Sequence, residues 1–164
     1  MTNEWQTAID YVQERGTAVE QARLRYLMHG ESAPTDVREQ FERGQRGDGG
    51  WSPPWAAEYS SVDATCFQLA QADQLGFDRR SPLFIDAVRF LAERQRADGY
   101  WEEEADVAAA APPWAQPSET AARLYLTANC GFWAAMTGLV PSAARDAAAY
   151  LSYHLRENGE LPSF

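Results

Sequence analysis

Residues 93–101 read E-R-Q-R-A-D-G-Y-W, and residues 43–51 read R-G-Q-R-G-D-G-G-W. The two strings share glutamine, aspartate, glycine and tryptophan at positions that lie 50 residues apart. The matched residues are Gln45, Asp48, Gly49 and Trp51 in the first string, and Gln95, Asp98, Gly99 and Trp101 in the second. A constant spacing of this size is typical of chains built from repeated structural units, so the strings predict a repeat architecture.

Each residue type of the shared string suits a tight corner that follows a helix. Glycine allows a positive φ just past a helix end, and the aspartate before it favours a turn through its side-chain oxygen. Tryptophan supplies a large apolar plate with one N–H donor, and glutamine offers both a donor and an acceptor. The string therefore predicts a structural corner at which one helical hairpin passes to the next, rather than a catalytic motif.

The apolar pattern around these strings has the period of α-helices. A leading helix carries Trp5, Ile9 and Val12 on one face. Six further helices are expected near residues 17–28, 35–43, 61–75, 82–96, 118–137 and 142–156. Paired helices of this length are too small to bury their apolar faces alone, whereas stacked neighbours bury them together. The pattern predicts one all-α domain over residues 1–164, with repeats at roughly 17–51, 52–101 and 102–161.

A weaker third copy of the string ends the pattern. It reads R-E-N-G-E-L at 156–161, and its Asn158-Gly159 pair follows Asp98-Gly99 by 60 residues. The ten additional residues fall in the acidic, alanine-rich stretch 102–117. We therefore expect the third unit to end in a degraded version of the same corner.

Composition and charge exclude several function classes. The formal net charge of the 164 residues is -10, which argues against nucleic acid as a partner because phosphate backbones need a basic face. No apolar run of about 18 residues is present, and the opening is polar, so we expect a cytoplasmic protein without a transmembrane segment. Asp63, Cys66 and His154 lack the spacing of a zinc site, so no metal and no cofactor are expected.

The strings Q-R-G-D-G-G-W and Q-R-A-D-G-Y-W resemble the QW repeats of squalene and terpene cyclases, and the hairpin repeat is similar to that of protein prenyltransferase β subunits. The resemblance covers roughly residues 17–161. It implies a partial α/α toroid of about three helical hairpins plus an N-terminal helix, with the helices near 17–28, 61–75 and 118–137 inside. A complete toroid of the family has about twice as many hairpins. We therefore expect two copies of this half ring to pair as a homodimer.

One acidic residue is a candidate for catalysis. The stretch S-V-D-A-T-C at 61–66 resembles the D-x-D-D-T-A box of squalene-hopene type cyclases, in which the central acid protonates an alkene or epoxide. The resemblance implies that Asp63 is this acid, although Ser61 and Ala64 replace the flanking acids of the box. Alternatively, Asp63 occupies the first turn of a helix, where a carboxylate interacts favourably with the helix dipole. The missing acids favour this second interpretation.

A second acidic stretch, E-E-E-A-D at 102–106, fits the acid-acid-x-x-acid pattern that binds magnesium diphosphate in ionisation-type terpene synthases. Those enzymes carry the pattern on a helix of a different fold. Here it lies in the insertion that follows Trp101, so the sequence favours a solvated acidic loop.

Aromatic residues are the candidates for ligand binding. Five of them fall on or near the helices that the resemblance places inside, namely Tyr59, Phe67, Tyr125, Phe132 and Trp133. In the cyclase family such rings line the cavity and stabilise carbocations through cation–π attraction. The resemblance implies an apolar pocket that suits an isoprenoid or another lipid-like ligand.

Three functions remain open from the sequence. The first is a cyclase-like or prenyltransferase-like enzyme that acts on an isoprenoid, with Asp63 as its acid. The second is a non-catalytic relative that keeps the apolar pocket and binds a lipid-like ligand. The third is a structural or protein-interaction module of the same fold. An enzyme predicts that Asp63 points into a closed pocket, whereas an interaction module predicts a shallow, open face.

Overall fold

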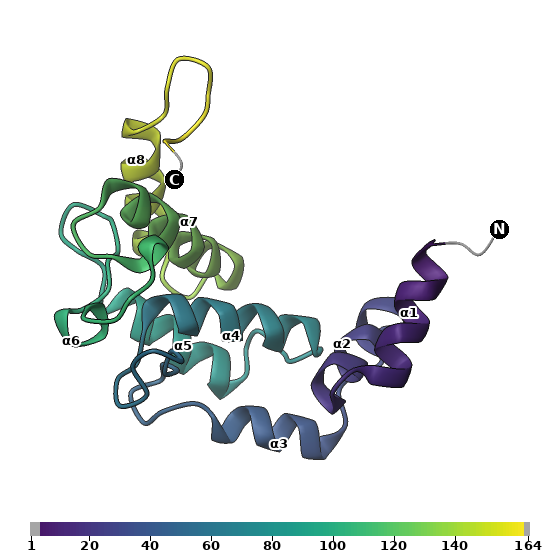
Figure 1. Cartoon of the computed structure of the whole chain (residues 1–164). Coiled ribbons are helices and arrows are strands. Elements are labelled where there is room, and N and C mark those ends of the chain that lie inside the picture. Colours follow the sequence, from purple (N-terminus) through teal and green to yellow (C-terminus); the bar gives the residue numbers. More distant parts are fainter. Residues whose placement is uncertain (1–3, 163–164) are drawn as a thin grey trace. The chain divides into compact units, whose positions relative to one another are not determined.

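The computed structural model describes residues 4–162, and every helix expected from the sequence is present in it (Figure 1). The helices are α1 (Glu4–Arg15), α2 (Ala18–His29), α3 (Thr35–Arg43), α4 (Val62–Gln74), α5 (Pro82–Ala92), α6 (Ala105–Ala108), α7 (Thr120–Thr137) and α8 (Pro141–Tyr153), with a short 3-10 helix η1 at Pro113–Ala115. The described residues contain no strand, and one isolated bridge joins Trp51 to Ser61. The predicted all-α class is therefore confirmed.

The chain divides into two compact units. The first comprises the described residues up to Gly44 together with Ala70–Asp78, and the second comprises Gln45–Leu69 and the described residues from Arg79 onward. Helix α4 contributes its first turns to the second unit and its last turns to the first. Within residues 4–162, no helix combines the length and apolar character needed to cross a bilayer. The single domain expected over residues 1–164 stays a prediction.

The first unit is held together around the end of α4 and the segment that follows it. The Ala33 amide donates to the carbonyl of Leu75 over 3.1 Å. The rings of Phe41 and Phe77 lie 5.5 Å apart, and the Arg38 guanidinium lies 4.1 Å from the centre of the Phe77 ring. The segment after α4 thus fastens α3 to this unit through both backbone and side chains.

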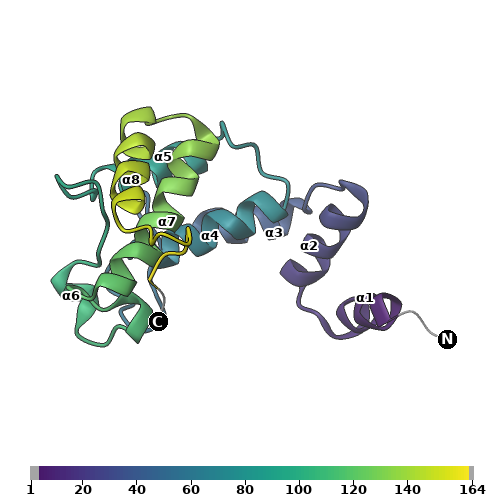
Figure 2. The same ribbon diagram turned by 90° about the horizontal axis from the view of Figure 1, so that it is seen from above.

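The second unit is built on α4, α5, α7 and α8. Helix α7 contacts both α5 and α8, and both ribbon views show it beside α8 (Figures 1 and 2). Its core contains the fully buried side chains of Leu69, Phe84, Val88, Phe90, Leu91, Trp101 and Leu126. Residues such as these supply most of the favourable free energy of folding, about 1.5–3 kcal/mol for each large apolar side chain.

Local signals place most helix ends where the sequence predicts them. Thr17 and Glu20 form the capping box at the start of α2, and Gly30 ends that helix with a left-handed φ of 70°. Pro82 occupies the first turn of α5, where its missing N–H loses no hydrogen bond. Ser118, just before α7, adopts a φ of 70° and does not cap that helix. Its amide instead donates to the Glu102 carboxylate over 3.3 Å.

The two matched glutamines join each corner to the start of a later helix. Gln45 Nε2 donates to the carbonyl of Gly49 over 2.9 Å and to that of Leu83, in the first turn of α5, over 3.0 Å. Gln95 Nε2 donates in the same way to Gly99 and to Ala143, in the first turn of α8, over 3.0 Å each. The glutamine therefore fixes the start of the following helix against the corner.

The matched glycines make this close approach possible. Gly49 and Gly99 both have a φ of 89°, which confirms the predicted positive φ. A Cβ at Gly49 would lie 2.4 Å from the carbonyl oxygen of Asp86, and one at Gly99 would lie 2.5 Å from that of Asp146. Both glycines therefore need to lack a side chain as well as to adopt a left-handed backbone.

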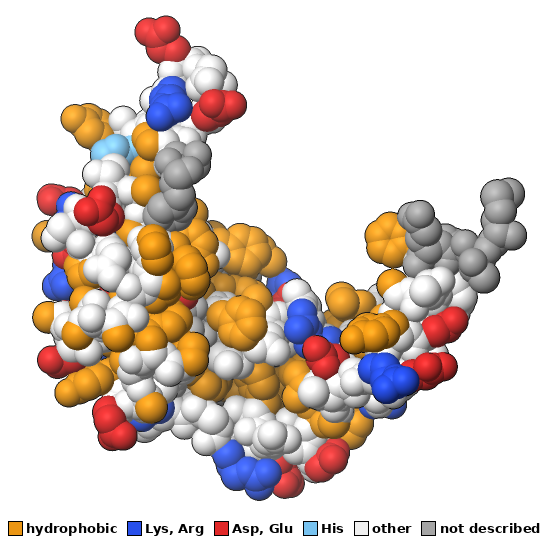
Figure 3. Space-filling model, in the orientation of Figure 1, with side chains coloured by type: hydrophobic (Ala, Val, Ile, Leu, Met, Phe, Trp, Pro, Cys, Tyr) orange, Lys and Arg blue, Asp and Glu red, His pale blue; other side chains and the backbone are white. Residues whose placement is uncertain are grey.

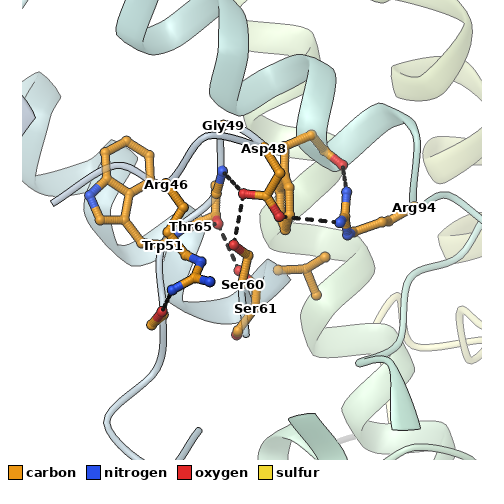
Figure 4. A network of polar contacts seen from close by, with 12 residues as sticks. Arg46, Asp48, Gly49, Trp51, Ser60, Ser61, Thr65 and Arg94 are labelled. Carbon is orange, nitrogen blue, oxygen red and sulfur yellow. Dashed lines mark hydrogen bonds and ion pairs between the residues drawn. The ribbon is translucent and has the colours of Figure 1, made fainter. Parts of the chain in front are cut away.

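The matched tryptophans lie under their corners. Trp51 and Trp101 are buried, as predicted, with exposed fractions of 4% and 0%. Each backbone N–H donates over 3.1 Å to a buried threonine hydroxyl, that of Thr65 in α4 for Trp51 and that of Thr127 in α7 for Trp101. Figure 4 shows Trp51 and Thr65 together with Asp48, whose carboxylate accepts from Ser60 and pairs with Arg94. The corners thus connect α4 with α5 and α7 with α8.

The third copy of the string adopts the same turn. The Arg156 amide donates to the carbonyl of Glu160 over 2.9 Å, as Arg46 does to Gly50 and Arg96 to Tyr100. Gly159 has a φ of 80°, and the side chain of Asn158 accepts from the Glu160 amide. The third corner therefore has the same backbone turn as the first two, although Leu155 and Leu161 stand where those corners have glutamine and tryptophan.

Replacing Gly49 by alanine should destabilise the second unit. The left-handed φ alone costs an alanine roughly 1–3 kcal/mol, and the contact with the Asp86 carbonyl adds to this. Gly47→Ala is the matched control, because a Cβ at Gly47 meets no described atom within 4 Å and its φ is not left-handed. Urea unfolding followed by circular dichroism measures both variants, and equal stability of the two would contradict the close approach.

Candidate functional site

The start of α4 is held by a carboxylate from another part of the chain. The buried side chain of Glu103 accepts from the Ser61 hydroxyl over 2.5 Å and from the amides of Val62 and Asp63 over 3.2 and 3.0 Å. The Ser61 hydroxyl in turn accepts from the Ala64 amide over 3.0 Å and so caps the start of α4. Glu103 thus satisfies amides that a helix start leaves without partners.

This arrangement corrects the prediction of a solvated acidic loop at 102–106 for Glu103, whereas Glu104 and Asp106 are exposed as predicted. Glu103 is only 2% exposed. Burial raises the pKa of its carboxyl above the ordinary value of 4.5, and the hydrogen bonds from Ser61, Asp63 and Val62 oppose that shift. The prediction was wrong because a run of acids along the sequence does not reveal that one member meets a helix start about 40 residues earlier.

The two neighbours of Glu103, Glu102 and Glu104, form ion pairs with arginines. Glu102 forms an ion pair with Arg123 over 2.9 Å and lies 3.6 Å from Arg96, and Glu104 lies 3.3 Å from Arg96. Glu102 also receives a hydrogen bond from the Arg123 Nε atom. The carboxylates of Glu102, Glu103 and Glu104 therefore point to protein groups, which is unlike a set of ligands gathered for magnesium.

Asp63 lies in the first turn of α4, as the second interpretation of the sequence predicted. Its side chain is partly buried, and its Oδ2 atom accepts from the Trp114 indole N–H over 3.2 Å. Tyr125 of α7 interacts with Asp63. Burial raises the pKa of the Tyr125 phenol to about 12, and the charge of Asp63 and its hydrogen bond with the phenol add to this shift. Asp63 thus lies between two aromatic side chains that can donate hydrogen bonds.

Exposed aromatic residues lie on α4 and α7, the helices that carry Asp63 and its neighbour Tyr125. Phe67 lies one turn after Asp63 on α4 and is 61% exposed, while Phe132 of α7 is 51% exposed. On α7 the exposed apolar residues recur at helical spacing, namely Tyr125, Ala128, Phe132, Ala135 and Met136. Hydrophobic side chains gather over the part of the second unit that contains α4 and α7 (Figure 3). Helix α7 therefore has a buried apolar side and a second, uncovered one.

Two of the five predicted aromatic residues lie elsewhere. Trp133 is 5% exposed, and its ring lies 6.0 Å from that of Phe84, so it is a core residue. Tyr59 lines a polar hollow of about 330 Å³, whose other lining residues are Arg46, Asp48, Glu58, Ser60, Arg94, Glu104, Asp106 and Val107. Phe67, Tyr125 and Phe132 remain as candidate ligand-binding residues, and the structure adds Trp114 to them.

The two cysteines meet between α4 and α7. The Sγ atoms of Cys66 in α4 and Cys130 in α7 are 3.6 Å apart, and both thiols are free and buried. Burial raises the pKa of the Cys130 thiol well above its ordinary value, and Cys66 raises it further. Both features are those of packed, protonated thiols. Among residues 4–162, no group of three His, Cys, Asp or Glu side chains forms a possible metal site.

Comparison with known proteins gives no family for this chain. No protein-family model matches it, and no curated protein matches its sequence. The chemistry of the site therefore follows from its own residues, which are a carboxylate with aromatic hydrogen-bond donors on an exposed apolar face.

Replacing Glu103 by alanine should destabilise the protein. The Ser61 hydroxyl and the amides of Val62 and Asp63 would lose their common acceptor, and an unpaired buried polar group costs about 1–3 kcal/mol. Glu104→Ala is the matched control, because this neighbour is exposed and its ion pair contributes about 0–1 kcal/mol. The unfolding free energies of the two variants, measured with urea, should differ clearly. Equal losses of stability would argue against Glu103 as the cap of α4.

The effect of Glu103 should also depend on pH. Since its pKa is raised in the folded state, the folded protein holds this proton more tightly than the unfolded chain does. The contribution of Glu103 to stability is then greatest below pH 4.5 and declines as the pH rises from there through the raised pKa. The difference in unfolding free energy between the native protein and Glu103→Ala should shrink over this interval. A difference that grows would contradict burial as the dominant influence.

Proposed function

We propose that this protein is a repeat protein similar to squalene and terpene cyclases and to prenyltransferase β subunits, and that it binds an isoprenoid or another lipid-like molecule on the aromatic face of α4 and α7. The observation that carries this proposal is the exposure of Phe67, Tyr125 and Phe132 around one carboxylate. Large apolar side chains gathered on a surface commonly mark a site of interaction.

The corners support the architectural part of the proposal. In an α/α toroid, successive outer helices follow one another around a ring of inner helices. Here Gln45 and Gln95 bind the starts of α5 and α8, and the threonines that accept from Trp51 and Trp101 lie in α4 and α7. We infer that α4 and α7 are inner helices and that α5 and α8 are outer ones.

Asp63 is the candidate acid if the protein is an enzyme. A cyclase of the protonating kind needs a carboxylic acid that reaches the alkene of its substrate. Asp63 is the acid that interacts with Tyr125 and Trp114, of which Trp114 fixes its Oδ2 atom. The flanking acids of the cyclase box are replaced by Ser61 and Ala64, of which Ser61 holds the helix start.

A second candidate function is a structural or protein-interaction module of the same fold. The observation that favours it is the openness of the face, because Phe67 and Phe132 are each more than half exposed. A broad apolar surface can bind a protein as well as a small ligand. We also propose that two copies pair as a homodimer, which would cover apolar surface such as that on α7.

Farnesol is a suitable probe for the proposed ligand site. Its binding should change the tryptophan fluorescence of the protein, to which Trp114 contributes, and Phe132→Ser should weaken binding about tenfold, since a buried phenylalanine contributes about 1.5–3 kcal/mol. Tyr153→Ser is the matched control, because Tyr153 is 85% exposed and lies at the end of α8. Absence of saturable farnesol binding to the native protein would refute the ligand site and leave the interaction module.

Asp63→Asn separates catalysis from binding. The amide oxygen of asparagine can still accept from Trp114, so farnesol should bind the variant as it binds the native protein. If Asp63 is the acid, any cyclised product formed from squalene should disappear in the variant, as measured by gas chromatography and mass spectrometry. Product formation that the substitution leaves unchanged would eliminate Asp63 as the acid.

A further inference from the structure

The chain makes the same helix-to-corner contact twice. In the first corner, residues 45–51, the glutamine donates to Leu83 O and the glycine lies against Asp86 O, both at the start of α5. In the second corner, residues 95–101, the corresponding partners are Ala143 O and Asp146 O at the start of α8. Each corner thus holds a pair of backbone carbonyls at the start of an outer helix.

The third corner, residues 155–160, is formed but holds no helix. Its turn has the same hydrogen bonds, and Gly159 has a φ of 80°. A Cβ at Gly159 would meet no described atom within 4 Å, in contrast with the contacts of 2.4 and 2.5 Å at Gly49 and Gly99. Next to it, Leu155 and Tyr153 are 48% and 85% exposed. The backbone of this corner is therefore shaped for a contact that the described chain does not supply.

Residues 33–36, which lead into α3 and include its first turn, carry the matching carbonyls. Leu83 and Ala143 lie 12 residues before positions 95 and 155, and Ala33 lies 12 residues before Gln45. Similarly, Asp86 and Asp146 lie nine residues before those positions, and Asp36 lies nine before Gln45. The burial agrees, since Ala33, Leu83 and Ala143 are 6%, 5% and 3% exposed. The start of α3 is therefore equivalent to the starts of α5 and α8, which the first two corners hold.

We propose that the third corner of one copy binds the start of α3 in a second copy. Gly159 would lie against Asp36 O of the second copy, and position 155 would face Ala33 O. This inference refines the homodimer proposed above by naming its contact surfaces, and it does not depend on the ligand site. Position 155 carries leucine where the other corners carry glutamine, so the contact lacks the hydrogen bond from corner to helix and should be weaker than its counterparts within the chain.

Restoring the glutamine gives a sharp test. Light scattering of the full chain should show a mass that rises with protein concentration. Leu155→Gln should tighten association by about two- to tenfold, because it adds one hydrogen bond across the contact, which contributes about 0.5–1.5 kcal/mol. Tyr153→Gln is the matched control, since it removes an exposed apolar side chain of the same region without placing an amide at the corner, and it should not tighten association.

The α3 surface is tested by adding bulk. Asp36→Trp should weaken association because it would crowd the corner, whereas Glu42→Trp, at the other end of the same helix, should leave it unchanged. Circular dichroism verifies that each variant is folded. If Leu155→Gln misfolds, the light scattering of Asp36→Trp tests the contact in its place. The mass of one chain at every concentration, for native protein and Leu155→Gln alike, would overturn both the homodimer and this contact. A dimer that Leu155→Gln leaves unchanged or weakens would overturn the contact alone.

Discussion

The second unit depends on one recurring interaction, the pair of hydrogen bonds that a corner glutamine donates to two backbone carbonyls. One acceptor belongs to the corner itself and the other to the first turn of α5 or α8. Because an amide group has two N–H donors in a fixed geometry, it determines both the shape of the turn and the position of the helix. The glycine allows the two backbones to approach, and the tryptophan beneath connects them to α4 or α7 through a threonine.

The same constraint shapes the candidate site. Thr65, whose hydroxyl accepts from the Trp51 amide, lies in the first turns of α4, four residues after Ser61. The Glu103 carboxylate, two residues after Trp101, caps the start of the same helix. Two successive corners thus fix the start of α4, on which Asp63 is carried. Asp63 and Phe67 therefore project from a rigid element, and Trp114 and Tyr125 reach Asp63 from η1 and α7. The face around Asp63 is open, which suits either an apolar ligand or a partner surface.

Sequence patterns predicted the features that depend on neighbouring residues. The corner glycines, the Thr17 capping box and the bounds of α3 followed from local chemistry that tertiary packing did not override. Glu103 could not be recognised as a cap because its partners lie about 40 residues away. Trp133 was assigned to the ligand face because α7 is apolar around most of its circumference, so that periodicity alone did not separate its buried side from its exposed one. The contact between Cys66 and Cys130 likewise depends on how α4 and α7 pack.

The central claim is that the corners are part of the stable core rather than mobile surface turns. Hydrogen exchange of the Trp51 and Trp101 backbone amides, followed by nuclear magnetic resonance, tests it most directly. If each amide is held by its buried threonine, both should exchange as slowly as the core amides of α7, through global unfolding of the second unit. Exchange at the rate of an exposed loop, with the α7 amides still protected, would contradict the account.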